Sequence, residues 1–382
     1  MKQSIDTLCV HGGAHKYPDA ARSVTVPIYQ SAAFSHLETG HNEHGFDYTR
    51  ISNPTRQHLE ETVSALEGAK KTIAFTSGMA AISCAFELFS PGDEIVCSGD
   101  LYGGTVLLMD LVGKKNGLNF KFVDTTDEAA LTAAVTENTR AIYIETPSNP
   151  MMNVTDIRLC AALAKQVGAL LLVDNTFLSP YFQNPIALGA DIVIHSGTKF
   201  LSGHNDTLSG FLCMADEALG ERLHKIAYAL GATLSPFDSY LMIRGIKTLA
   251  VRMERQQETA LAIAAWLKQQ KNVTRVYYAG LPEHPGYEKN RNQSRGSGSM
   301  LSFAVDSHET ALKLLQNVKI ATFAESLGGP ETLITLPALQ THRDVPEEER
   351  LKLGITDSLL RMSVGLENAG DLIADLNQAL NG

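Results

Sequence analysis

The chain has 382 residues, of which 44% are hydrophobic and 19% are charged, and its formal net charge is −10. Nucleic acids and anionic membrane surfaces attract cationic proteins, so this acidic balance disfavours both kinds of partner. No apolar stretch approaches the roughly 18 residues that a membrane-spanning helix needs, and the first residues lack the apolar core of a secretory signal. The five cysteines are scattered without a Cys-x-x-Cys pair, which favours reduced thiols in the cytoplasm over disulfides or a zinc site.

The pattern of apolar and polar residues divides the chain into three parts. Residues 1–55 show no sustained periodicity, so we expect an arm that lies on its own body or on a neighbouring subunit. Residues 56–245 alternate helical and strand patterns, which predicts βαβ units around a mostly parallel sheet. Residues 246–382 begin with a long helical pattern and continue with strands and shorter helices, which predicts a smaller α+β domain. The expected fold class is therefore α/β.

Periodicity and end signals predict the individual elements. A helix over 55–67 is expected to stop at Gly68, because glycine readily adopts the left-handed conformation that ends helices. Short apolar runs predict buried parallel strands at 72–75, 94–97, 141–144, 169–173 and 191–194. In the last part we expect helices at 246–270, 309–316 and 369–380, and strands at 274–278 and 299–305.

Four groups of residues follow predicted strands, which is where open parallel sheets bind ligands. Thr76–Ala80 begins a helix with small residues, which suits a phosphate but also an ordinary tight turn. Asp174 ends an apolar strand, so it either caps the next segment or pairs with a cation. Lys199 is either a solvated loop cation or an amine nucleophile with a lowered pKa. Tyr102 precedes two glycines and either packs at a rim or lies against a flat ligand.

Together these residues describe a site for pyridoxal 5′-phosphate (PLP), which proteins hold through a lysine Schiff base and an acidic partner at the ring nitrogen. Ser196 and Thr198 would supply hydroxyl donors for its phosphate. A nicotinamide-dependent enzyme is disfavoured because no Gly-x-Gly-x-x-Gly follows a predicted strand. A catalytically silent PLP protein is disfavoured because Lys199, Asp174, Tyr102 and Arg361 are all present. The histidines have no accompanying carboxylate or thiol cluster, so no metal site is expected.

The whole chain resembles the Cys/Met-metabolism family of PLP-dependent enzymes, which includes cystathionine γ-synthases, γ-lyases and β-lyases, methionine γ-lyases and homoserine sulfhydrylases. The motifs that carry the resemblance are Tyr48–Thr55, Ser77–Met79, Leu101–Thr105, Glu145–Pro150, Val173–Thr176, Ser196–Lys199, Glu325–Gly329 and Leu360–Glu367. The resemblance implies a fold-type I, PLP-dependent transferase-like architecture. It also implies a homotetramer built as a dimer of active dimers.

The resemblance further implies roles for the matching residues. Lys199 would hold the cofactor covalently and move protons, and Tyr102 would stack on the ring and act as the second catalytic residue. The other cofactor-binding residues implied are Asp174 at the ring nitrogen, Thr176, and Gly78, Met79, Ser196 and Thr198 at the phosphate. Tyr48 and Arg50 would reach the phosphate of a neighbouring subunit. The substrate-binding residues implied are Arg361 and Asn149 at the α-carboxylate, with Ser326 and Glu325.

Three positions bear on the choice of substrate. Glu325 either holds the distal ammonium of cystathionine or is an exposed rim residue. Leu107 stands where cystathionine enzymes usually carry an arginine, and Gly104 stands where methionine γ-lyases have a cysteine. The resulting hypothesis is a cytoplasmic C–S lyase that acts mainly by γ-elimination on cystathionine, homocysteine or methionine. The alternatives are γ-replacement on an O-acyl-homoserine, as in cystathionine γ-synthase, and β-elimination, as in cystathionine β-lyase.

Overall fold

The computed structural model describes residues 3–13, 22–37, 39, 45–343, 345 and 347–382. Within them, the larger sheet has seven strands in the order β1-β7-β6-β5-β4-β2-β3. These strands are β1 (Lys71–Phe75), β2 (Glu94–Ser98), β3 (Asn119–Val123), β4 (Thr139–Glu145), β5 (Leu170–Asp174), β6 (Ile192–Ser196) and β7 (Gly210–Met214). Only β7 runs against its neighbours β1 and β6, and the other pairings are parallel. The predicted α/β fold with a mostly parallel sheet is confirmed.

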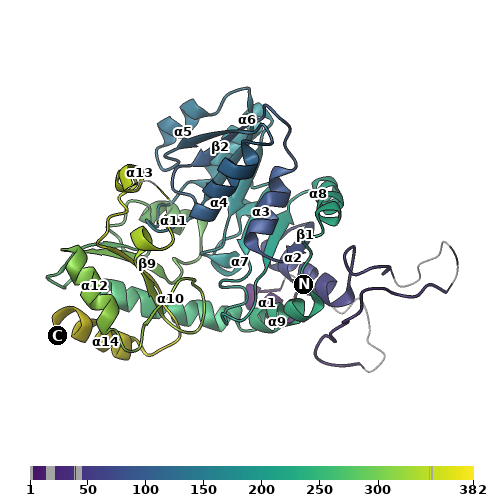
Figure 1. The fold of residues 1–382 in the computed structure, drawn as a ribbon. Helices are drawn as coiled ribbons and strands as arrows, with labels where there is room; N and C mark the ends of the chain where they lie inside the picture. Colours follow the sequence, from purple (N-terminus) through teal and green to yellow (C-terminus); the bar gives the residue numbers. More distant parts are fainter. Residues whose placement is uncertain (1–2, 14–21, 38, 40–44, 344, 346) are drawn as a thin grey trace.

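Helices cover both faces of this sheet (Figure 1). On one face, α2 (Pro54–Glu67) and α6 (Ile157–Val167) pack apolar side chains against Leu171 and Val173 of β5. On the other face, α3 (Gly78–Phe86) and α8 (Glu217–Leu230) pack against Leu172 and Ile194. Helix α2 ends at Gly68 in the left-handed conformation (φ 75°), as predicted.

Two strands of the larger sheet, β3 and β7, were not predicted from the sequence. Strand β3 is an edge strand that alternates polar and apolar residues and is only partly buried, so it forms no continuous apolar run. Strand β7 is fully buried, but nothing in its short sequence indicates that it runs antiparallel. The remaining elements of this part are α4 (Gly103–Leu108), the π-helical turn η1 (Met109–Gly113), α5 (Glu128–Ala134), α7 (Ser179–Phe182), the 3-10 helix η2 (Pro185–Leu188) and α9 (Pro236–Ile246).

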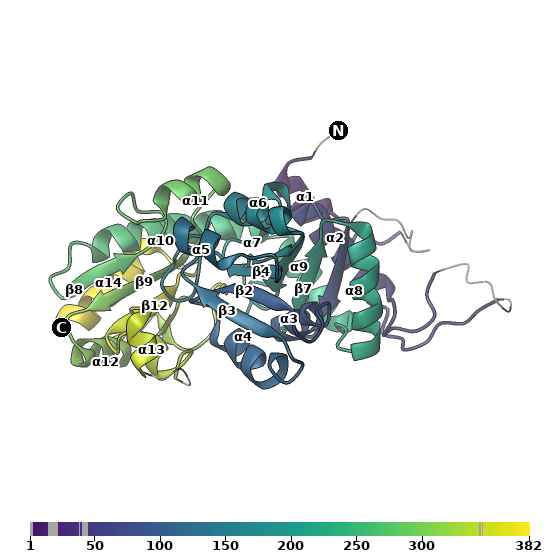
Figure 2. The ribbon, with the colours of Figure 1, turned by 90° about the horizontal axis from the view of Figure 1, so that it is seen from above.

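The smaller sheet lies beside the larger one (Figure 2) and has the strand order β10-β11-β12-β9-β8. Its strands are β8 (Val273–Tyr277), β9 (Met300–Val305), β10 (Thr322–Phe323), β11 (Leu333–Thr335) and β12 (Leu359–Ser363). Helices α12 (His308–Asn317) and α14 (Ala369–Asn381) pack on it around a separate apolar cluster. The other elements are α11 (Tyr287–Gln293), the 3-10 helix η3 (Pro337–Leu339) and α13 (Glu347–Lys352).

Helix α10 (Leu249–Leu267) connects the two cores. Its first turns bury Leu249 and Met253 in the core of the larger sheet, and its later turns bury Ile263 and Leu267 in that of the smaller sheet. The predicted helix over 246–270 is wrong at its start, because residue 246 is the last residue of α9. The hydroxyl of Thr248 donates to the carbonyl of Gly245 at 3.1 Å, which satisfies the end of α9 and separates the two helices.

The N-terminal part is more structured than its sequence indicates. Helix α1 (Ile5–His11) buries Cys9 and packs against α2 and α10. The described residues that follow reach away from both sheets (Figure 1). They are tied to the start of α2 by Thr55, whose hydroxyl donates to the carbonyl of Pro27 at 2.8 Å and accepts from the amide of Tyr29 at 3.0 Å. Among the described residues, no helix combines the length and apolarity needed to cross a bilayer.

Candidate active site

A cavity of about 250 Å³ opens at the carboxyl ends of β4, β5 and β6 and is closed on its far side by residues of the smaller sheet. This is the position at which parallel sheets bind their ligands. Every site residue predicted from the sequence borders it, except Tyr48 and Arg50. The predicted residues that line it are Gly78, Met79, Tyr102, Asn149, Asp174, Thr176, Ser196, Thr198, Lys199, Glu325, Ser326 and Arg361.

Lys199 lies in the turn that follows β6, and its side chain points into the cavity. Its Nζ donates a hydrogen bond to the hydroxyl of Ser326 at 3.0 Å. Burial, and secondarily the positive charge of Arg361, lowers the pKa of Lys199 to about 8. The amine is therefore available in its neutral, nucleophilic form far closer to neutral pH than an ordinary lysine is.

Asp174 is the last residue of β5, and only 9% of it is exposed. Its Oδ1 accepts the amide of Thr176 at 3.0 Å, and the hydroxyl of Thr176 in turn accepts the amide of Ser196 at 2.9 Å. Burial raises the pKa of Asp174, because water no longer stabilises its charge. A carboxyl group in this setting is suited to a cationic partner inside the cavity.

The start of α3 supplies a pocket for an anion. Ser77 caps the helix by accepting the amide of Ala80 at 3.1 Å. A Cβ atom added at Gly78 would lie 3.0 Å from the Cβ of Ser196, so only glycine lets the helix and β6 approach this closely. The free amides of a helix start and the nearby hydroxyls of Ser196 and Thr198 are typical donors to a phosphate.

Tyr102 stands at the start of α4 and is 42% exposed. Its amide donates to Oε2 of Glu145 at 2.9 Å, which fixes the backbone at this point. A Cβ atom at Gly104 would lie 2.5 Å from Cε1 of Tyr102. The absence of a side chain at Gly104 therefore allows the ring of Tyr102 to occupy its observed position.

Arg361 enters from β12, in the middle of the smaller sheet, and is only 3% exposed. Its guanidinium donates to the side chain of Asn149 at 2.9 Å and to the carbonyl of Ser326 at 3.2 Å. Its Nε is buried without a hydrogen-bond partner. Burial lowers the pKa of Arg361 to about 10, and the group is still cationic at neutral pH. An unpaired donor on a buried cation indicates that an anionic ligand binds there.

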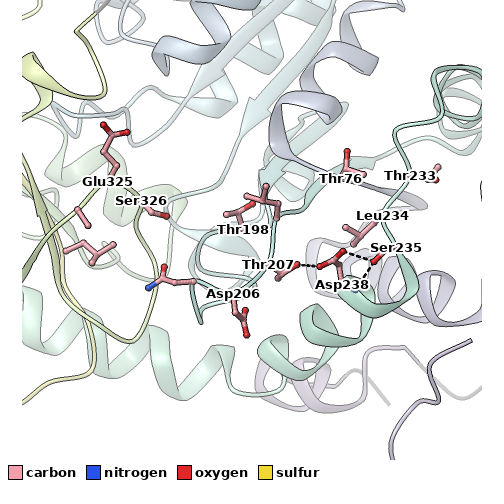
Figure 3. Close-up of a pocket in the computed structure, with 14 residues that line it drawn as sticks. Thr76, Thr198, Asp206, Thr207, Thr233, Leu234, Ser235, Asp238, Glu325 and Ser326 are labelled. Atoms are coloured by element: carbon pink, nitrogen blue, oxygen red, sulfur yellow. Dashed lines mark hydrogen bonds between the residues drawn. The ribbon is translucent and has the colours of Figure 1, made fainter. Parts of the chain in front are cut away.

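Glu325 borders a second, larger cavity of about 850 Å³ as well as the first. Figure 3 shows Glu325 and Ser326 on one side of the larger cavity and Thr76 and Ser235 on the other. The two cavities share Thr198, Leu208, Glu325 and Ser326. Leu107 is 52% exposed and borders neither cavity.

Tyr48 and Arg50 lie away from the cavity of their own chain. Arg50 stacks over the ring of Tyr228 at 4.5 Å and donates to the carbonyl of that residue at 3.1 Å. Tyr48 is half exposed. This placement leaves both side chains at the surface of the chain, near the end of α8.

Sequence reasoning gave no role in the site to some residues that line the cavity, although three of them lie in the motifs named above. They are Ser77, Ile82, Glu145, Phe177, Leu208, Leu327 and Thr341. Glu145 carries a signal that could have been used, because it ends an apolar strand in the same way as Asp174. Within the described residues, no group of three or more His, Cys, Asp or Glu side chains could hold a metal ion.

A fold and cavity of this kind define a PLP-dependent enzyme. The model of the Cys/Met metabolism PLP-dependent enzyme family matches residues 6–381, and the chain belongs to this family. It is 46% identical to a cystathionine γ-lyase of Bacillus subtilis over 374 residues, which cover 98% of both chains. A cystathionine β-lyase of the same organism is also 46% identical, over 99% of this chain and 96% of the relative.

A third Bacillus subtilis relative, a cystathionine γ-synthase/O-acetylhomoserine (thiol)-lyase, is 45% identical over 100% of this chain and 97% of its own. Among solved structures, the cystathionine γ-synthase from Xanthomonas oryzae pv. oryzae in complex with aminoacrylate and cysteine superposes with a TM-score of 0.96. It is 40% identical and covers 100% of this chain and 98% of its own. Since relatives with three activities are equally similar, overall identity does not select the reaction.

The residues of the cavity fit the cofactor of this family. A lysine with a lowered pKa can bond to an aldehyde, and the carboxyl group of Asp174 can face a protonated ring nitrogen. The close approach at Gly78 leaves a cradle that a side chain would fill. The unpaired Nε of Arg361 remains for the carboxylate of an amino acid. The enzyme therefore uses PLP with amino-acid substrates.

Proposed function

We propose that the protein is a C–S lyase that acts mainly by γ-elimination on cystathionine, homocysteine or methionine, releasing a thiol, ammonia and 2-oxobutyrate. The observation that carries this proposal is the position of Glu325 at the junction of the two cavities. A substrate held by its α-carboxylate at Arg361 extends past Glu325 into the larger cavity. The distal ammonium of cystathionine finds its counter-charge at that carboxylate.

The α-end of the substrate is held in the same way for each of these substrates. Arg361 grips the α-carboxylate with a forked pair of hydrogen bonds, and Asn149 keeps the guanidinium in place from the other side. Ser326 orients the amine of Lys199. When bound, PLP supplies a protonated ring that withdraws electrons from the substrate Cα, and Asp174 keeps that ring protonated.

Proton transfers are assigned to two side chains. The neutral amine of Lys199 removes the Cα proton and then carries protons between Cα, Cβ and Cγ. For γ-elimination a Cβ proton must leave too, before the γ-substituent can depart. Tyr102, which stands at the cavity mouth, donates a proton to the departing thiolate. Water then releases ammonia and the 2-oxo acid.

Two other outcomes use the same site. In γ-replacement, the acyl group of an O-acyl-homoserine leaves Cγ as a carboxylate, and a thiol that enters the larger cavity adds at Cγ in its place. The volume of that cavity favours this candidate. In β-elimination, the bond to Cβ breaks directly and pyruvate is formed. Relatives named for each of these activities are as similar to the chain as the γ-lyase is.

An end-point assay with the PLP-loaded enzyme distinguishes the three reactions. The substrates are cystathionine, homocysteine, methionine, cysteine, and O-acetylhomoserine together with cysteine. We expect mainly 2-oxobutyrate, and Lys199→Ala serves as the inactive control. Mainly pyruvate from cystathionine would identify a β-lyase, and cystathionine formed from the acetyl ester would identify a synthase. Either result would overturn γ-elimination and leave the cofactor site standing.

We also propose that the enzyme works as a homotetramer in the cytoplasm, with residues 1–55 as an arm onto a neighbouring subunit, 56–245 as the PLP-binding domain and 246–382 as the substrate-carboxylate domain. The exposed position of Tyr48 and Arg50 supports the arm, and Arg50 would exchange its contacts with Tyr228 for the phosphate of a neighbour. The reduced state of the cytoplasm suits five buried cysteines that form no disulfide.

Hybrid dimers test the shared site. Arg50→Ala and Lys199→Ala each impair the enzyme for a different reason, and in a mixed dimer one of the two sites regains an intact set of residues. We expect partial recovery of activity after the two variants are mixed and allowed to exchange subunits. Hybrids verified by mass that show no recovery would contradict an arm that acts between subunits.

A further inference from the structure

Glu145 is a second buried carboxyl group of the cofactor cavity, and the reaction described above gives it no role. It is the last residue of β4 and is 7% exposed. Its Oε2 accepts the amide of Tyr102 at 2.9 Å, and its side chain borders the same cavity as Asp174. A carboxyl group held at this place affects both the charge and the geometry of the site.

Glu145 and Asp174 are direct neighbours across two parallel strands, because residues 145 and 174 are partners in the register of β4 and β5. Adjacent strands lie about 4.8 Å apart, and partnered residues point to the same face. Two carboxylates carried by such neighbouring residues, both shielded from water, repel each other strongly. One of the two therefore retains a proton over the range in which ordinary carboxyl groups are ionised.

The other charged and titratable groups around Glu145 come from four different elements. They are Tyr102 before α4, Tyr143 on β4, Asp100 after β2 and Arg361 on β12. Asp100 adds further negative charge, and it is held in place by the amide of Asn153 at 2.7 Å. Burial and then the charge of Asp174 raise the pKa of Glu145 well above its ordinary value. The hydrogen bond from the amide of Tyr102 and then the charge of Arg361 oppose this shift less strongly.

We propose that Glu145 is a positioning residue that stays a neutral carboxylic acid in the working enzyme, so that the single negative charge of the Glu145–Asp174 pair resides on Asp174. Its Oε2 holds the backbone of Tyr102, and its neutral form leaves one anion opposite one cationic ring nitrogen. A second anion would have no counter-ion, because Arg361 already contacts Asn149 and binds the substrate carboxylate. The inference rests on the proposed assignment of Asp174 to the ring nitrogen.

Infrared difference spectroscopy of the PLP-loaded enzyme tests the charge directly. Wild type minus Glu145→Gln is expected to show the carbonyl stretch of a neutral carboxylic acid near neutral pH, and this band should shift in D₂O. The matched control is Glu94→Gln, which removes a carboxyl group at the opposite end of the neighbouring strand β2, where it accepts the hydroxyl of Thr139 at 2.9 Å. Wild type minus Glu94→Gln should lack the band.

Asp174→Asn tests the charge of Glu145 separately from its structural role, because a purely structural role would not change the pH midpoint of the Glu145 band. At saturating PLP, this variant should lose the Glu145 band at a lower pH than wild type does, because the repelling anion is gone. Glu145→Gln should hold PLP within about threefold of the wild-type dissociation constant, since the amide oxygen still accepts from Tyr102, and Glu145→Leu should weaken it about tenfold.

Two results would overturn the inference: only ionised carboxylate bands in the Glu145→Gln difference spectrum, or a band whose pH midpoint is the same with and without Asp174. The assignment of Asp174 fails separately, if Asp174→Asn binds PLP as tightly as wild type. A missing Glu145 band together with weak PLP binding by Asp174→Asn would remove the present inference alone.

Discussion

Replacement of Arg361 is the most direct test of how the substrate is held. The guanidinium has two fixed contacts, at 2.9 Å to Asn149 and 3.2 Å to the carbonyl of Ser326, and its Nε has no partner. A carboxylate at this position accepts two charge-assisted hydrogen bonds, each worth about 1.5–3 kcal/mol. Arg361→Ala should therefore remove at least about 3 kcal/mol of transition-state stabilisation. This loss corresponds to a decrease in kcat/KM of roughly 100-fold or more.

The comparison of two variants separates charge from geometry. Arg361→Lys keeps the positive charge but cannot form the fork, so its kcat/KM should fall between those of wild type and Arg361→Ala. The matched control is Arg275→Ala, which removes the same charge from a residue stacked over Tyr277 at 4.7 Å and outside the cavity. Kinetics are referred to the amount of bound PLP, which its visible absorbance reports.

Unreactive ligands show whether the effect comes from the α-carboxylate itself. Arg361→Ala should raise the dissociation constant of an unreactive amino acid about 100-fold or more and leave that of the corresponding amine without a carboxylate nearly unchanged. If both ligands weaken equally, Arg361 acts only on the shape of the cavity. If kcat/KM stays within about threefold of wild type, the substrate carboxylate is bound elsewhere.

Three further outcomes follow from burial and contacts in the structure. The rate at which PLP attaches to the apoenzyme should rise with pH through a midpoint near 8, because the pKa of Lys199 is lowered to about 8 and only its neutral amine attacks an aldehyde. Stopped-flow absorbance measures this rate, and a midpoint above about pH 10 would contradict the prediction. Cys97 and Cys213 should react with a thiol reagent only after denaturation, since burial raises the pKa of both thiols. Arg252→Ala should lower the free energy of unfolding by about 3 kcal/mol or more, because the buried carbonyls of Phe200 and Gly245 lose the guanidinium that donates to each of them at 2.9 Å. A denaturant titration that shows a loss below about 1 kcal/mol would refute the stabilising role of these two hydrogen bonds.

Much of the scaffold could be predicted because its strands are short, apolar and bounded by clear end signals. Strand ends were predicted at residues 173 and 194, within two residues of Asp174 and Ser196, where β5 and β6 end. The family motifs supplied residues from the other sheet, such as Arg361. The register of neighbouring strands could not be predicted, because it depends on how the whole sheet assembles. For this reason the pairing of Glu145 with Asp174 across β4 and β5 is visible only in the structure.

Tertiary contacts also override local pattern in two other places. Helix α1 is only seven residues long and too short to be stable alone, and it persists because Cys9 packs into the core formed by α2 and α10. The hydroxyl of Thr198 accepts the amide of Ser209 at 3.0 Å because the antiparallel β7 returns to the end of β6. No pattern in the sequence around Ser209 indicates that it supports the turn after β6, which carries Thr198 and Lys199.

The structure also accounts for why relatives with different reactions are equally similar to this chain. In the proposed mechanism, Lys199 acts at Cα, Asp174 faces the ring and Arg361 binds the carboxylate, which every one of these reactions requires, and the three residues depend on both sheets for their positions. The reactions differ only at Cβ and Cγ, which in the proposed binding mode would lie toward Glu325 and the larger cavity. Under this proposal a few residues around that cavity would decide between elimination and replacement, and so few positions contribute little to overall identity. Substitution of Glu325 should change product ratios without changing the visible spectrum of the bound cofactor. Substitution of Asp174 should change that spectrum without changing product ratios.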